Sequence, residues 1–171
     1  MTLFATLTPS ALDRSSFLKA FADIYEHAPW VAERVYEQGI DAADDHIEHL
    51  HARMAVVVLN ADHGRQLTLI NAHPDLAGKA AVRGELTAAS TSEQVGAGIQ
   101  ECTPEEFARF TALNQAYKAR FGFVFIMAVK GSTRQQILAA FEERLRNTSE
   151  QEFARALAEI NRIALFRLHA L

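Results

Sequence analysis

Two side chains that could move protons lie at expected helix starts. His73 directly precedes Pro74, and a proline restricts the residue before it to extended backbone, so we expect His73 at a helix boundary. Pro74 suits the first turn of whatever follows it. Glu93 lies three residues after Ser90, which is the spacing of a capping box and predicts a helix from about Ser90. If the two starts face each other, they form a polar pocket that contains a group able to move protons near neutral pH.

Each of these residues also has a structural explanation. His–Pro pairs are common in turns, and a capping-box glutamate needs no role beyond capping. The positions from Ser90 to Gln94 would begin a helix, and the free N–H groups of a helix start favour an anionic ligand. The chain contains neither a recognisable nucleophile motif nor a phosphate-binding loop.

The composition is that of an ordinary globular protein. The chain has 171 residues, of which 49% are hydrophobic and 22% are charged, so we expect one domain over residues 1–171. A net charge of −4 argues against a nucleic-acid partner, and Cys102 is the only cysteine, so no intrachain disulfide can form. No apolar run is long enough for a membrane span, and no secretory signal is evident. We expect a cytoplasmic protein.

The spacing of apolar residues predicts a mostly helical chain. Two segments could instead be buried strands, namely 55–59 and the continuous apolar run 121–129, so a mixed α+β fold stays open. The sequence Glu-His-Ala-Pro-Trp at 26–30 breaks the first helical region, and Trp30 is most simply a core residue. Helical segments are expected within 10–38, where Phe17 and Phe21 have helical spacing, and within 44–59 and 75–82. Further helices are expected from about 90 to 100, from a capping box at Thr103 and Glu106 to about 120, from a capping box at Ser132, and, after a capping box at Thr148 and Gln151, from about 150 to 169.

Two polar residues fall on apolar helix faces. Asn114 lies between aromatic residues, and a buried amide needs a hydrogen-bond partner, most simply a neighbouring backbone group and alternatively a ligand. Arg167 lies in line with Ile160 and Ala164 on the last helix. A core-facing arginine must pair with a buried acid or reach a polar cavity, and the spacing leaves both alternatives open.

Three histidines form the densest cluster in the chain. His46 and His49 share a helix face and could hold a metal with an acidic neighbour, as in a metal-dependent hydrolase of ureides. His51 points elsewhere, and the pair lacks a recognisable third ligand, so a solvated helix start is the better interpretation. A non-catalytic helical interaction module, in which the motifs are only caps, is a further alternative.

The order of the motifs resembles one family. His-Pro-Asp-Leu-Ala-Gly is followed by Leu-Thr-x-x-Ser-x-x-Glu-Gln-x-x-Ala-Gly and then by Leu-Asn-x-x-Tyr-x-x-x-Phe-Gly-Phe. This pattern resembles 2-oxo-4-hydroxy-4-carboxy-5-ureidoimidazoline (OHCU) decarboxylase, from about Phe17 to the C-terminus. The resemblance implies an all-α, single-domain fold with an extended apolar segment near 122–130. It also implies a homodimer that converts OHCU to (S)-allantoin in urate breakdown without a cofactor or metal.

The resemblance also implies roles for individual residues. His73 would transfer the proton, Glu93 and Gln94 would hold the ureido and ring N–H groups, and Arg167 would counter negative charge on the substrate. Of the two alternatives for Arg167, the resemblance therefore favours a wet pocket in which the arginine awaits an anion. The family has proline where this chain has Val124, which loosens the backbone but leaves the other pocket contacts possible. The implied catalytic residues are His73, Glu93 and Arg167, and the implied substrate-binding residues are Pro74, Ser90, Thr91, Ser92, Glu93, Gln94, Phe125, Ile126, Met127, Ala128 and Val129.

Overall fold

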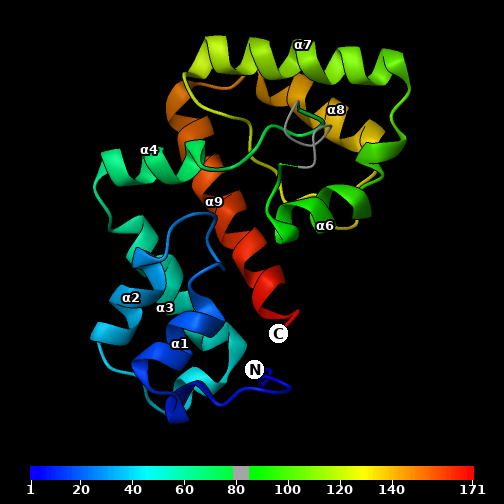
Figure 1. Cartoon of the computed structure of the whole chain (residues 1–171). Coiled ribbons are helices and arrows are strands. Elements are labelled where there is room, and N and C mark those ends of the chain that lie inside the picture. Colours follow the sequence, from blue (N-terminus) through cyan, green and yellow to red (C-terminus); the bar gives the residue numbers. More distant parts are fainter. Residues whose placement is uncertain (79–84) are drawn as a thin grey trace. The chain divides into compact units, whose positions relative to one another are not determined.

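The computed structural model describes residues 1–78 and 85–171, and its regular elements are helices (Figure 1). In these two ranges the only β pairing is an isolated bridge between Leu3 and His46, so the all-α expectation is confirmed. The 3-10 turns are η1 (Pro9–Ala11), η2 (Ala42–Asp45) and η3 (Ile99–Glu101). The α-helices are α1 (Arg14–Phe21), α2 (Trp30–Glu37), α3 (Ile47–Leu59), α4 (His63–Asn71), α6 (Ala88–Gly96), α7 (Pro104–Phe121), α8 (Arg134–Arg144) and α9 (Ser149–Leu168).

Contacts divide the chain into two compact units. One unit holds residues 1–72 and 160–171, and the other holds residues 73–159. Helix α9 therefore contributes its first half to the second unit and its last turns to the first unit. The expectation of a single domain over residues 1–171 stays a prediction. No helix in the described ranges has both the length and the apolarity to cross a membrane.

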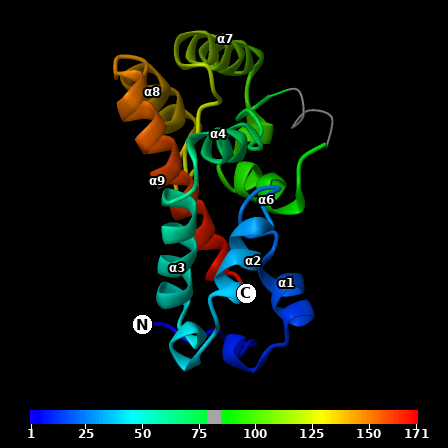
Figure 2. The ribbon, with the colours of Figure 1, turned by 90° about the vertical axis from the view of Figure 1, so that its left-hand side faces the viewer.

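In the first unit, α2 packs against both α1 and α3 (Figure 2). Phe17 and Phe21 lie one turn apart on α1, are fully buried, and hold their ring centroids 4.6 Å apart. Their spacing is the helical periodicity that predicted this element. Segment 55–59, which was ambiguous between strand and helix, forms the end of α3.

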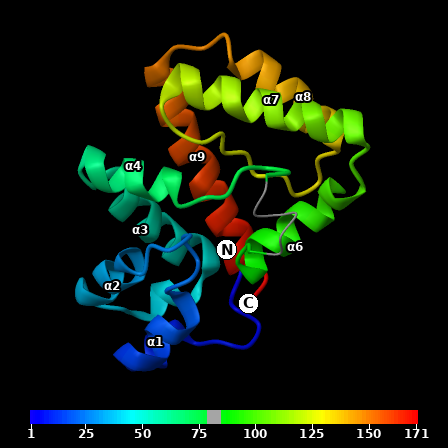
Figure 3. The same cartoon turned by 45° about the horizontal axis from the view of Figure 1, so that its top comes forward.

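In the second unit, α7 and α8 lie side by side (Figure 3). Aromatic rings join them: Tyr117 on α7 meets Phe141 on α8 edge-on with centroids 6.3 Å apart, and Phe125, which follows α7, stacks on Phe141 at 3.6 Å. A buried ion pair completes this core, because Arg144 Nη2 lies 2.8 Å from Glu152 Oε2, which also accepts a hydrogen bond from the Tyr117 hydroxyl. Arg144 therefore lies in the core without being an unpaired charge.

The helix caps confirm some of the predicted starts and correct others. The capping box of Thr103 and Glu106 opens α7 as expected, and Thr148 and Gln151 exchange the same pair of hydrogen bonds before α9. The box before α8 is one residue later than expected, because Thr133 is the cap in place of Ser132. Part of the expected helical turn over 75–82 lies outside the described residues.

The predicted capping box of Ser90 and Glu93 is wrong. The cap of α6 is Thr87, whose hydroxyl accepts a hydrogen bond from the Ser90 N–H. Two hydroxyl residues three apart can each cap a helix, and the earlier one does so here because two alanines, which are strong helix formers, extend the helix back to it. Glu93 therefore lies in the middle of α6 and not at its start.

Candidate active site

The His73 loop, residues 73–78, is a turn that carries the predicted proton-transfer residue. His73 is buried, with 8% of its surface exposed. The loop is tied to two helices: the Asn114 side chain on α7 donates to the Leu76 carbonyl (2.8 Å), and the Ala77 N–H donates to Gln94 Oε1 on α6 (3.1 Å). The structural role expected for Asn114 is thereby confirmed. These two contacts hold the peptide between Leu76 and Ala77, three residues after His73.

Helix α6 presents Ser90 and Gln94, one turn apart, as its buried polar residues. Thr91 and Glu93 are half-buried, and Ser92 is exposed. The expectation of free N–H groups from Ser90 onward is corrected, since the Ser90 N–H donates to the Thr87 hydroxyl and the Thr91 N–H to the Thr87 carbonyl. Any anion held by this helix would therefore be met by side chains rather than by these two amides.

The apolar run after α7 is extended but belongs to no sheet, as the resemblance implied. Gly122, at φ +80°, ends α7 in the left-handed conformation that glycine adopts without strain. Two buried side chains hold the backbone beyond it: Arg144 Nη1 donates to the Ile126 carbonyl (2.6 Å), and the Ala128 N–H donates to Glu159 Oε2 (2.8 Å). Within residues 1–78 and 85–171 no strand pairs with this segment, and side chains fix its backbone instead.

The extended segment contains five of the residues implied to bind substrate. Of these, Phe125, Ile126, Ala128 and Val129 are buried, and Met127 is half-buried. The buried network of Tyr117, Arg144 and Glu152 next to this segment shifts two pKa values. Burial raises the pKa of Tyr117, as does its hydrogen bond to Glu152. Burial also raises the pKa of Glu152, but hydrogen bonds from Arg144, Tyr117 and Asn147 outweigh it and hold that pKa below its usual value. Glu152 is therefore the ionised acceptor that keeps Arg144 in place behind Ile126.

Arg167 differs from the expectation. Its Nη1 lies 2.9 Å from Glu26 Oε2 and 3.3 Å from the Ile24 carbonyl, and both charged residues are buried in the first unit. The expectation that Arg167 lies unpaired in a wet pocket is therefore wrong, because it pairs with a buried acid, while its role toward the substrate stays a prediction. Sequence reasoning missed Glu26 as that acid, although it belongs to the Glu-x-x-Pro-Trp segment that marked the end of a helix.

The three clustered histidines have separate contacts. His49 Nδ1 lies 3.0 Å from Asp44 Oδ1, His51 Nε2 lies 2.7 Å from the Asn161 carbonyl oxygen, and His46 is the N-cap residue of α3. Over residues 1–78 and 85–171, no three histidine, cysteine, aspartate or glutamate side chains are grouped as metal ligands. His49 and His51 therefore bind different partners and do not converge on one point.

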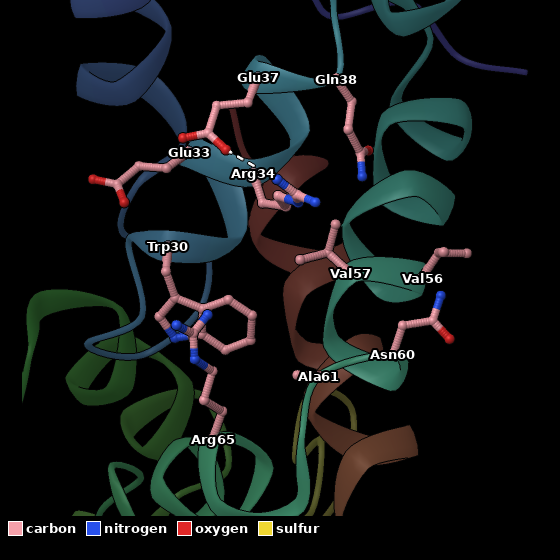
Figure 4. Close-up of a pocket in the computed structure, with 10 residues that line it drawn as sticks. All are labelled: Trp30, Glu33, Arg34, Glu37, Gln38, Val56, Val57, Asn60, Ala61 and Arg65. Carbon is pink, nitrogen blue, oxygen red and sulfur yellow. Dashed lines mark hydrogen bonds and ion pairs between the residues drawn. The ribbon is translucent and has the colours of Figure 1, made fainter.

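A hollow of about 650 Å³ opens in the first unit between α2, α3 and the start of α4 (Figure 4). Trp30, expected in the core, is half-buried on its wall, with the Arg65 guanidinium 5.6 Å from the ring centroid. Arg34 and Glu37 form an exposed ion pair on the same wall. None of the residues implied to bind or transform substrate lines this hollow.

Comparisons with known proteins agree with the motif order. The family model described as OHCU decarboxylase matches residues 10–169. The 2-oxo-4-hydroxy-4-carboxy-5-ureidoimidazoline decarboxylase of Haloferax volcanii is 40% identical over 157 residues, which cover 92% of this chain and 89% of that protein. The protein of the same name from Halalkalicoccus jeotgali is 40% identical over 160 residues, which cover 93% of this chain and 86% of that protein.

Among solved structures, (S)-allantoin synthase is similar with a TM-score of 0.74 and 30% identity, covering 95% of this chain and 52% of that one. This chain thus spans about half the length of that synthase. The family match and the two decarboxylases, by contrast, extend over nearly the full length of this chain and include both of its units. On this evidence the chain belongs to the OHCU decarboxylase family.

Proposed function

We propose that this chain is a carboxy-lyase that converts OHCU to (S)-allantoin in urate breakdown. The observation that carries the proposal is the 40% identity to OHCU decarboxylases over 92–93% of the chain. The all-helical fold and its extended segment near 122–130 agree with it. The proposed substrate is accordingly a small polar heterocycle that bears a carboxylate and a ureido group.

The chemistry requires few protein groups. When the C–CO2 bond breaks, its electron pair remains on the ring, where the adjacent carbonyl and imine groups spread the negative charge. Because the substrate delocalises its own electrons, the reaction does not need a cofactor to hold them. The protein must bind the carboxylate and the ureido arm, and it must deliver a proton to one face of the ring. A proton added from bulk water would reach either face.

His73 is the proposed proton-transfer residue, because an imidazole can donate and accept a proton near neutral pH. Glu93 and Gln94 are proposed to hold the N–H groups of the ureido arm and ring. Gln94 already binds the Ala77 N–H through Oε1, and an amide oxygen can accept a second hydrogen bond. Its engagement with the His73 loop is therefore compatible with a ligand contact.

The remaining proposed contacts line the pocket. Pro74, Ser90, Thr91, Ser92 and the segment from Phe125 to Val129 are proposed to contact the substrate, the segment through a backbone that Arg144 and Glu159 hold in place. Arg167 is proposed to counter negative charge on the substrate, with Glu26 orienting its guanidinium. These assignments rest on the motif positions.

Circular dichroism tests the proposed activity. Urate is oxidised immediately before use, the protein is added, and optical activity is followed as allantoin forms. We expect a signal of (S)-allantoin that grows in proportion to protein concentration, whereas the reaction without protein yields racemic product with no net signal. A protein-containing sample that stays optically silent while allantoin accumulates contradicts the proposal.

The assembly and compartment of the protein are part of the proposal. We propose a cytoplasmic homodimer, which the family resemblance supports. Light scattering coupled to size-exclusion chromatography measures the molar mass in solution. A mass near twice the 19.0 kDa of one chain agrees with the proposal, and a mass of one chain at micromolar concentration contradicts it.

A further inference from the structure

The peptide unit between Leu76 and Ala77, inside the His73 loop, is held on both of its edges. Its carbonyl accepts a hydrogen bond from Asn114 on α7, and its N–H donates to Gln94 on α6. The two groups of a trans peptide point in opposite directions, so two helices grip one peptide from opposite sides. Both amide side chains are at least nine-tenths buried, at 4% exposure each.

Ala77 has an unusual backbone conformation. Its φ is +52°, in the left-handed region that residues with a Cβ rarely adopt, and the residue is buried. Such conformations persist only where surrounding contacts over-determine them, and they cluster at functional sites. The contacts that over-determine this one are the two amide hydrogen bonds on the preceding peptide.

Helix α7 makes a second contact with the loop one turn further on. Lys118 Nζ lies 2.7 Å from Asp75 Oδ2, and Lys118 follows Asn114 by four residues, so both side chains project from the same face of the helix. The carbonyl of Asp75 also accepts a weaker hydrogen bond from Gln94 Nε2 at 3.4 Å. Three consecutive loop residues, 75–77, are therefore fixed directly after His73 and Pro74.

We infer that Asn114 and Lys118 are positioning residues, which hold the His73 loop in its strained shape so that the imidazole stays aligned for proton transfer. This inference rests on the proposed function only through the role of His73. Neither residue needs to touch the substrate. Folding alone does not require a left-handed backbone conformation at an alanine. Holding a catalytic side chain in one orientation can require such a conformation.

Kinetics of purified variants test the inference. Asn114→Leu keeps the approximate size of the side chain but removes the donor to Leu76, and we expect kcat to fall about 100-fold, the effect of a small misplacement of a catalytic group. KM should change much less, because the substrate contacts remain. Lys118→Met should also lower kcat. Lys118→Arg should keep most of the wild-type kcat, because it retains the positive charge opposite Asp75.

Two further variants separate positioning from stability. Ile137→Val trims a fully buried side chain on α8 and should lower the melting temperature without changing kcat. Ala77→Gly should keep or raise the melting temperature, since glycine adopts positive φ without strain, yet it should lower kcat because the loop gains freedom. If Asn114→Leu does not fold, Ala77→Gly and the two Lys118 variants decide the matter.

A second readout does not depend on turnover. The imidazole C–H signal of His73, assigned by its loss in His73→Asn, should move in ligand-free Asn114→Leu and stay in place in Ile137→Val. Loss of melting temperature in Asn114→Leu with both kcat and this signal unchanged would overturn the inference. If the wild-type protein proved inactive on OHCU, the proposed function would fail, while the His73 signal would still test the positioning.

Discussion

Breaking the buried ion pair between Arg167 and Glu26 should destabilise the protein strongly. The two groups are 2.9 Å apart, and Arg167 and Glu26 expose only 8% and 3% of their surfaces. Removing one partner leaves an uncompensated buried charge, which costs about 3–5 kcal/mol. For a protein of this size each kcal/mol corresponds to a shift of roughly 2–4 °C in melting temperature. Arg167→Met should therefore melt about 6–20 °C below the wild type.

The double variant Glu26→Gln with Arg167→Met identifies the cause of that loss. Replacing both charges removes the stranded carboxylate, and exchanging a buried pair for uncharged residues is often close to neutral. Most of the lost stability should return. Thermal unfolding followed by circular dichroism, with urea denaturation at 25 °C, measures both variants and the wild type. An Arg167→Met protein with the same melting temperature as the wild type would refute the reasoning.

The same set of variants tests whether Arg167 also serves catalysis. If its guanidinium meets negative charge on the substrate, the double variant recovers stability but remains impaired in kcat/KM. Arg167→Lys keeps the charge but loses the planar fork that matches a carboxylate, so it should also be impaired. Recovery of kcat/KM together with stability in the double variant would assign Arg167 a structural role alone.

The remaining predictions concern the proton-transfer residue, metal dependence and pH. His73→Asn should lower turnover about 10²- to 10⁴-fold, and near-normal production of (S)-allantoin would contradict that role. Exhaustive chelation should leave the rate unchanged, and a loss restored by added zinc or manganese would instead favour a metal-dependent hydrolase. Because the folded-state pKa of Glu152 is lowered, its ionisation stabilises the fold above the ordinary glutamate pKa of about 4.3, and this stabilisation is lost as pH falls through the folded-state pKa. Glu152→Gln should therefore be less stable at pH 7 and lose less stability between pH 5 and 3; equal slopes in urea titrations would contradict this.

Local signals in the sequence predicted the parts of the fold that depend on neighbours along the chain. The Thr103 capping box and the apolar spacing of α1 each involve residues within one or two turns, and both are confirmed. The cap of α6 was misplaced because Thr87 and Ser90 are both competent caps at adjacent turns, and the sequence does not rank them.

The parts that could not be predicted depend on residues far apart in the sequence. Helical spacing showed that Asn114 and Arg167 face inward, but it could not show that their partners are the Leu76 carbonyl and Glu26. The left-handed backbone of Ala77 could not be predicted from the sequence, because positive φ is expected at glycine and asparagine and not at alanine. Its cause is tertiary, since two helices hold the adjacent peptide.

The most direct test of the proposed activity follows the substrate carboxylate itself. OHCU is generated from urate labelled with ¹³C so that the carboxyl carbon is visible by NMR, and the wild type is compared with His73→Asn. With the wild type, we expect the carboxylate signal to be replaced by labelled CO2 and bicarbonate as an equal amount of (S)-allantoin forms, and we expect this to slow by at least about 100-fold in the variant. Decay of the carboxylate at the same rate with and without the wild-type protein would contradict the assignment of this chain as the decarboxylase.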